Sequence, residues 1–168
     1  EGRAPARVGV MGSSAGGHLA ASLATLHAHP DAADTLGDHA TAESARPDAA
    51  LLCYPVITLQ TAHTHLGSRE NLLGPAPSSA LTDLLSTERQ VTADHPPTFL
   101  WHTTDDDVVD VENPLLYAAA LRRARVAFAL HVFARGSHGL GLGHADKPAP
   151  PGSVCLEHWL RELGWITA

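Results

Sequence analysis

Residues 7–20 read RVGVMGSSAGGHLA, and this stretch decides the fold. Its first part, Val8 to Met11, is a short apolar run that predicts a buried β-strand. The G-x-S-x-G pattern of residues 12–16 follows directly, and an alanine-rich helical segment begins behind it. A strand, a tight turn and a helix in this order are typical of a turn that holds out a nucleophilic serine. We expect the turn to leave no room for a side chain at Gly12 or Gly16. The alternative is a Gly/Ser-rich connecting turn without a chemical role.

Strands and helices alternate along the rest of the chain. The apolar patterns predict further strands at Ala49–Tyr54, Thr98–His102 and Ala127–Phe133. They predict helices at Ala15–His27, Ser78–Ser86, Glu112–Arg125 and Ser153–Leu163. The expected core-facing residues of two helices are Leu19, Leu23 and Leu26, and Leu115, Leu116, Ala119 and Leu121. The alternation predicts an α/β fold in a single domain, residues 1–168, with a parallel sheet of about four strands and helices on both faces.

The composition is that of a globular domain. Of the 168 residues 44% are hydrophobic and 17% are charged, and the formal net charge is -7. The eleven Lys and Arg residues form no basic run, which argues against a nucleic-acid partner. No apolar stretch approaches the length of a membrane span, which argues against a membrane partner. Cys53 and Cys155 lie far apart in apolar stretches and are expected to be free thiols. The start of the chain does not resemble a signal peptide, and the sequence leaves the compartment open.

A nucleophilic serine needs a histidine that takes its proton and a carboxylate that orients the imidazole. Behind a serine turn of this kind, the acid and then the histidine follow in chain order, at the carboxyl ends of later strands. Three acid candidates, Asp105, Asp106 and Asp107, come directly after a predicted strand. We select Asp106, which lies four residues beyond His102 and precedes an apolar anchor. The alternative for this segment is a solvated acidic turn.

His138 is the best-placed base among the twelve histidines, because it follows the last predicted strand and has glycines on both sides. His144 in the same loop is the second candidate. His131 falls within a strand and is expected to pack in the core, and His102 ends a strand and is expected to serve backbone geometry.

Two H-x-H pairs, His27/His29 and His63/His65, raise the question of a metal site. Neither pair has further Cys, Asp or Glu ligands at close spacing along the chain. We therefore expect no metal ion.

Several stretches together resemble the acetylxylan-esterase-like and feruloyl-esterase-like α/β-hydrolases, a carbohydrate esterase family. In chain order they are residues 9–20 (GVMGSSAGGHLA), 53–58 (CYPVIT), 67–74 (GSRENLLG), 96–103 (PPTFLWHT) with 111–113 (VEN), and 130–133 (LHVF) with 136–142 (GSHGLGL). The resemblance implies Ser14 as nucleophile, Asp106 as orienting acid and His138 as base, with the Ala15 N–H as half of an oxyanion hole. It implies no cofactor. The sequence departs from the family at Asp110, where relatives usually have proline.

The same resemblance implies strands before the serine turn that this sequence does not show. The four predicted strands would then be the C-terminal part of an α/β-hydrolase fold, with residues 8–11 at the edge of the sheet. Unpaired apolar edge strands pair readily with other strands. We expect either a homodimer through residues 8–11 or pairing of this edge with a missing N-terminal segment. The resemblance also implies oxyanion donors upstream, and the loss of one such donor costs about 10²–10³ in turnover.

The leading hypothesis is a serine esterase that removes short acyl groups, acetyl above all, from carbohydrate or similar small-molecule esters through an acyl-enzyme. One alternative is a serine peptidase of the prolyl-oligopeptidase kind, which shares the fold and the order of the three residues. Another is a truncated, non-catalytic fragment of an esterase. Tyr54, Thr58 and Trp101 are candidates either for pocket lining or for core packing.

Overall fold

The computed structural model describes residues 7–30, 45–143 and 151–167. Its centre is a parallel sheet of β1 (Gly9–Ser13), β2 (Ala49–Cys53), β3 (Thr98–Thr103) and β4 (Phe128–Phe133). The strands are neighbours in chain order, β1-β2-β3-β4. Ser13 pairs with Cys53, and Cys53 pairs with Trp101, so the carboxyl ends of the strands lie along one edge of the sheet. Loops that leave this edge can therefore meet one another.

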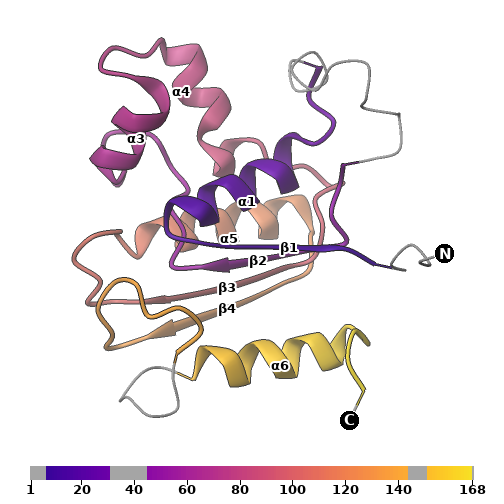
Figure 1. Cartoon of the computed structure of the whole chain (residues 1–168). Helices are drawn as coiled ribbons and strands as arrows, with labels where there is room; N and C mark the ends of the chain where they lie inside the picture. Colours follow the sequence, from indigo (N-terminus) through magenta and orange to yellow (C-terminus); the bar gives the residue numbers. More distant parts are fainter. Residues whose placement is uncertain (1–6, 31–44, 144–150, 168) are drawn as a thin grey trace, which may run out of the picture.

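Helices cover both faces of the sheet, as Figure 1 shows. One face carries α1 (Ala15–Leu26) and α5 (Glu112–Ala124), and the other carries α6 (Gly152–Glu162). The excursion between β2 and β3 holds α3 (Leu66–Leu73), α4 (Ser79–Leu85) and the 3₁₀ helix η2 (Thr87–Arg89), with α3 and α4 beyond α1. This arrangement confirms the predicted α/β fold class. In the part of the chain that the structure describes, no helix is long and apolar enough to cross a membrane.

The hydrophobic core has one layer on each side of the sheet. Leu52, Leu100, Tyr117 and Leu121 are fully buried between the sheet and the α1/α5 face. Phe99 and Trp101 pack against Leu156 and Trp159 on the α6 face. Cys53 and Cys155 belong to this second layer, and both are free thiols, as predicted. By contrast, β1 is exposed along much of its length, and half of the Met11 surface (50%) is open to solvent.

The helix faces differ from the sequence prediction. Leu19 is 73% exposed and Leu23 is 39% exposed, so these two leucines of α1 face outward, while Leu26 is half-buried. The buried residues of α1 are small apart from one histidine: Gly17, His18, Ala20, Ala21 and Ala24. Small side chains allow a helix to approach a sheet closely, and the alanine side of α1 is the one that packs into the core.

The predicted face of α5 is also wrong except at Leu121. Leu115 is 45% exposed and Leu116 is 37% exposed, and Ala119 is exposed as well. The buried stripe is Asn113, Tyr117 and Leu121, spaced four residues apart on one side of the helix. Asn113 belongs to this stripe because its side chain accepts hydrogen bonds from the N–H groups of Ile57 (2.8 Å) and Thr58 (3.1 Å).

Candidate active site

Ser14 lies in the turn between β1 and α1 in a strained backbone conformation, with φ 55° and ψ -126°. Its N–H donates to the Cys53 carbonyl at 3.1 Å, and its own carbonyl accepts from the N–H groups of Gly17 and Val56, both at 3.0 Å. These bonds tie the turn to the start of α1 and to the segment after β2. The surrounding backbone therefore compensates for the strain at Ser14 and fixes where its hydroxyl points.

Close backbone contact explains two glycines of the turn. A Cβ added at Gly12 would lie 2.0 Å from the Gly16 carbonyl oxygen, and one added at Gly17 would lie 2.6 Å from Pro55 Cβ. A Cβ added at Gly16 would meet nothing within 4 Å. The prediction for Gly12 is confirmed and the prediction for Gly16 is wrong. Gly16 contributes only the backbone against which Gly12 packs. The second position that has no room for a side chain is Gly17.

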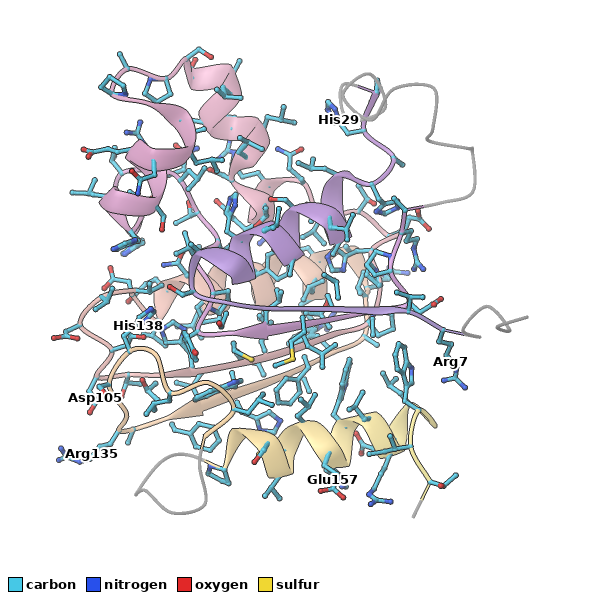
Figure 2. The ribbon with its side chains drawn as sticks, in the orientation of Figure 1. Arg7, His29, Asp105, Arg135, His138 and Glu157 are labelled. Atoms are coloured by element: carbon cyan, nitrogen blue, oxygen red, sulfur yellow. The ribbon has the colours of Figure 1, made fainter. Side chains whose placement is uncertain are left out.

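A chain of two short hydrogen bonds begins at the Ser14 hydroxyl. Ser14 Oγ lies 2.8 Å from His138 Nε2, and His138 Nδ1 lies 2.8 Å from Asp106 Oδ2. The three residues come from the β1–α1 turn, the loop after β3 and the loop after β4, and Figure 2 shows His138 at the carboxyl edge of the sheet. The fold thus brings together the three residues that sequence order had selected.

Asp106 is held in a way that keeps it ionised. Its side chain is only 1% exposed, and Oδ1 accepts from the N–H groups of Val108 and Val109, both at 3.0 Å. Burial alone would raise the pKa of Asp106, but the Val109 N–H, His138 and the Val108 N–H together lower it below its usual value. An ionised carboxylate accepts the Nδ1–H of His138, which leaves Nε2 free to accept the serine proton.

The neighbouring aspartates have other contacts. Asp105 Oδ1 accepts from the Gly136 N–H at 2.6 Å, so this residue positions the loop that carries His138. Asp107 is exposed. Among the three acid candidates, Asp106 therefore makes the contact with His138.

His102 lies directly beneath Asp106. It is fully buried, its Nε2 lies 2.8 Å from the Val109 carbonyl oxygen, and the same nitrogen lies 3.4 Å from Asp106 Oδ2. Burial lowers the pKa of His102, so the ring is neutral and donates one proton from Nε2. His102 thus serves backbone geometry, as predicted. It bonds to the turn at Val109, and the N–H groups of this turn donate to Asp106.

Tyr54, a candidate for pocket lining or core packing, contacts the loop that carries His138. Its hydroxyl accepts from the Gly141 N–H at 2.8 Å, and its ring stands edge-on to His138 with centroids 5.1 Å apart. The loop after β4 therefore rests on Tyr54. Trp101 and Thr58 are buried and belong to the packing. The position of Tyr54 immediately after β2, at the carboxyl edge of the sheet, brings it to this loop.

Two other histidine predictions have different outcomes. His131 lies in β4 with its ring centroid 5.3 Å from that of Phe99, which fits the expected packing role. His144 falls outside the described residues.

Ala15 is the first residue of α1, so its N–H has no acceptor within the helix. A cavity of about 500 Å³ begins beside it. The cavity lies between α1 and the excursion after β2 and is lined by leucines together with Ser22, Ser68 and Asn71. A space next to the serine thus offers both apolar contact and hydroxyl or amide groups.

Two solved structures with a similar fold are hydrolases. The chain overlays on an acetyl ester-xyloside bifunctional hydrolase from Caldicellulosiruptor lactoaceticus with a TM-score of 0.83 at 42% identity, covering 95% of this chain and 57% of that one. It overlays on a carboxylesterase from Lactobacillus plantarum with a TM-score of 0.74 at 30% identity, covering 96% of this chain and 60% of that one. The fold and the serine turn define an α/β-hydrolase.

The family follows from the sequence comparison: residues 3–121 match the BD-FAE family model, and the chain belongs to that family. It is 45% identical over 137 residues to endo-1,4-beta-xylanase B of Butyrivibrio fibrisolvens, covering 82% of this chain and 21% of the relative. It is 30% identical over 163 residues to an acetylxylan esterase of Xylanibacter ruminicola, covering 95% of this chain and 31% of the relative. The chain therefore spans between a fifth and a third of these curated relatives.

Proposed function

We propose that the chain carries the catalytic residues of a serine esterase that removes acetyl groups from carbohydrate esters. Ser14 is the nucleophile, His138 the general base and Asp106 the acid that orients it. The observation that carries this proposal is the continuous hydrogen-bond chain from Ser14 Oγ through His138 to Asp106, with both distances at 2.8 Å.

The geometry supports an acyl-enzyme mechanism. Neutral His138 takes the proton from Ser14 Oγ through Nε2 as the oxygen attacks the ester carbonyl. The resulting imidazolium is stabilised by the ionised Asp106 and gives its proton to the departing alcohol. Water then attacks the acyl-serine with His138 again as base, and the carboxylic acid leaves.

The Ala15 N–H is the proposed oxyanion donor of this chain. It stands at the start of α1, where the helix dipole favours negative charge, and it belongs to the residue after the nucleophile. A backbone donor so placed stabilises the charge on the tetrahedral oxygen without reorganising.

Two observations support a carbohydrate acetyl ester as the substrate. The named relatives include an acetylxylan esterase and an acetyl ester-xyloside hydrolase. The cavity of about 500 Å³ beside Ala15 is larger than an acetyl group requires, and its serine and asparagine side chains suit sugar hydroxyls while its leucines suit the apolar face of a sugar ring.

The proposal is tested by following p-nitrophenyl acetate hydrolysis and acetate release from acetylated xylo-oligosaccharides. Ser14→Ala should abolish both activities, and Asp106→Asn should lower kcat by about 10³–10⁴-fold, because His138 then loses its orienting acceptor. A chromogenic prolyl peptide serves as the competing substrate and should not be cleaved.

Asp107→Asn is the matched control, since it removes a carboxylate from the same loop at an exposed position. It should retain nearly full activity. Equal rates in the wild-type protein and Ser14→Ala would show that the chain is a scaffold without a working site. Equal losses in Asp106→Asn and Asp107→Asn would refute the assigned role of Asp106.

A further inference from the structure

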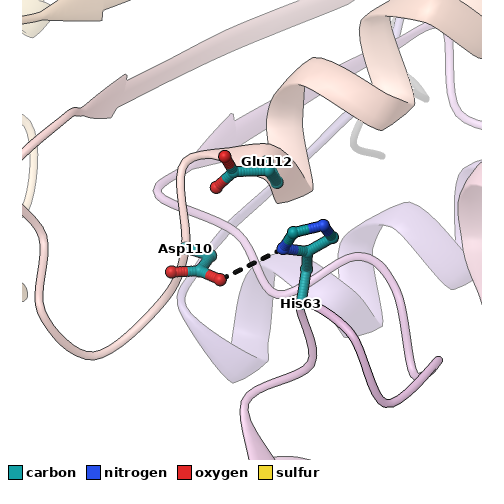
Figure 3. Close-up of side chains that lie close together, drawn as sticks. All are labelled: His63, Asp110 and Glu112. Carbon is teal, nitrogen blue, oxygen red and sulfur yellow. Dashed lines mark hydrogen bonds and ion pairs between the residues drawn. The ribbon is translucent and has the colours of Figure 1, made fainter.

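Three side chains of types that can bind a metal ion lie close together, as Figure 3 shows: His63, Asp110 and Glu112. One ligand atom from each lies within 4.8 Å of the other two, and His63 Nδ1 is 3.2 Å from Asp110 Oδ2. His63 comes from the segment between β2 and α3, whereas Asp110 and Glu112 come from the start of α5 and the loop before it. Separations of this size between ligand atoms contract readily onto one cation, whose bonds to nitrogen and oxygen are about 2.0–2.2 Å long.

The backbone beneath the three side chains is fixed by one buried residue. Asn113 Nδ2 donates to the His63 carbonyl at 2.9 Å and to the Asp110 carbonyl at 3.0 Å. Asn113 is fully buried. A single amide thus locks together two segments that lie about fifty residues apart in sequence. The ligand-bearing backbone is therefore preorganised before any cation arrives.

The charge of the cluster is unbalanced. Asp110 and Glu112 place two carboxylates beside one imidazole, and His63 is the ion-pair partner of Asp110. Within residues 7–30, 45–143 and 151–167, the Glu112 carboxylate has neither a hydrogen bond nor an ion pair. Two neighbouring carboxylates repel each other unless a cation lies between them. This arrangement favours a bound positive ion over a simple His–Asp pair.

We propose that His63, Asp110 and Glu112 bind a divalent transition-metal ion of the zinc class. One imidazole and two carboxylates suit zinc, and the imidazole disfavours magnesium and calcium, which prefer all-oxygen sites. Three protein ligands leave at least one position for water. His63 and Asp110 are 41% and 56% exposed at their side chains, so an ion can enter from solvent.

The metal would join the segment after β2 to the loop that carries Asp106. Asp110 directly follows Val109, whose N–H is bonded to Asp106 Oδ1 and whose carbonyl lies 2.8 Å from His102 Nε2. The ion therefore acts as a clamp on this loop. Its expected effect is a gain in stability, because an ion that binds only the folded protein stabilises it by mass action.

The test uses the whole protein that carries this sequence, stripped of metal with a chelator and titrated with zinc chloride in a calorimeter. The wild-type protein should bind one equivalent of Zn²⁺ and show a higher Tm with zinc than without it. Asp110→Asn and Glu112→Gln should each weaken Zn²⁺ binding by about tenfold or more and remove the shift in Tm. Magnesium chloride at the same concentration should give no shift.

His158→Gln is the matched control, because His158 and Glu162 form another exposed His–carboxylate pair, at 3.3 Å, and among the described residues no third ligand joins them. This variant should bind zinc as the wild-type protein does. If Asp110→Asn does not fold, Glu112→Gln still decides, since the Glu112 carboxylate makes no hydrogen bond or ion pair within the described residues that the change would remove. The proposal is overturned if the wild-type protein binds no zinc, or if Glu112→Gln binds it with wild-type affinity.

Discussion

The glycines behind Ser14 make a sharp test of the turn. Gly16 and Gly17 are adjacent residues in the first turn of α1, and the same substitution by alanine should act on them in opposite directions. At Gly16 the new Cβ meets nothing within 4 Å. Alanine loses less backbone freedom on folding than glycine, so Gly16→Ala should stabilise the protein by roughly 0.5–1 kcal/mol.

At Gly17 the new Cβ would lie 2.6 Å from Pro55 Cβ and 2.8 Å from Pro55 Cα. Both contacts are well inside van der Waals distance, and a proline ring cannot rotate away. Overpacking of this kind costs about 1–3 kcal/mol, which outweighs the gain in helix propensity. Because both variants share the gain in helix propensity, they should differ by the overpacking cost alone, about 1–3 kcal/mol in the free energy of unfolding.

Urea denaturation followed by circular dichroism measures this difference. With a slope of about 2 kcal/mol per molar urea, the midpoints of the two variants should be separated by about 0.5–1.5 M. Gly17→Ala should also lower esterase turnover, because Pro55 precedes Val56, whose N–H holds the Ser14 carbonyl at 3.0 Å. If Gly16→Ala destabilises the protein as much as Gly17→Ala does, the steric argument fails.

Three further predictions rest on other contacts. Burial lowers the pKa of His95 from 6.5 to about 4. Between these pH values the unfolded chain binds a proton at His95 that the folded protein does not bind. The free energy of unfolding should therefore fall by up to about 3 kcal/mol as the pH drops from 6.5 to 4. Urea titrations at several pH values should show a shallower fall for His95→Gln, and parallel profiles would contradict this assignment. Tyr54→Phe removes the acceptor of the Gly141 N–H and should lower the free energy of unfolding by about 1 kcal/mol. It should also reduce kcat more than it changes KM. Wild-type stability together with wild-type kcat would show that the loop does not depend on this bond. We propose that the exposed edge of β1 pairs with another strand, from a second copy or another segment. Sedimentation of these 168 residues should then show association, and Met11→Lys should weaken it. A monomer at every concentration would count against this pairing.

Local patterns in the sequence were enough to predict the order of the four strands and of the helices α1, α4, α5 and α6, whereas α3 and η2 were not placed. The run before Gly12 predicts β1, and proline and glycine residues mark where later elements begin and end. The order of Ser14, Asp106 and His138 along the chain was also visible, because loops at the carboxyl ends of parallel strands converge. These features depend on neighbouring residues and on topology, and both can be inferred without coordinates.

The faces of the helices could not be inferred in this way. In α1 and α5 the leucine spacing indicated a buried face, yet Leu19 and Leu115 are exposed and alanines, a histidine and an asparagine are buried instead. The hydrophobic pattern of a helix does not specify how closely the helix approaches the sheet. Pro55 lies against Gly17 and sets that distance for α1, and Asn113 is buried because its hydrogen bonds to the chain after β2 are satisfied there.

The sequence alone determined that a strand ends in a serine turn, that strands and helices alternate, and that an acid and a histidine follow in the order an α/β-hydrolase requires. Only the tertiary structure decided which of three adjacent aspartates faces His138, which glycine is sterically required, and that His63 meets Asp110 and Glu112. The physical reason is the same in each case. Turns, strands and helices arise from interactions between residues close in sequence, whereas these contacts join residues about 30 to 50 positions apart, and packing sets their geometry.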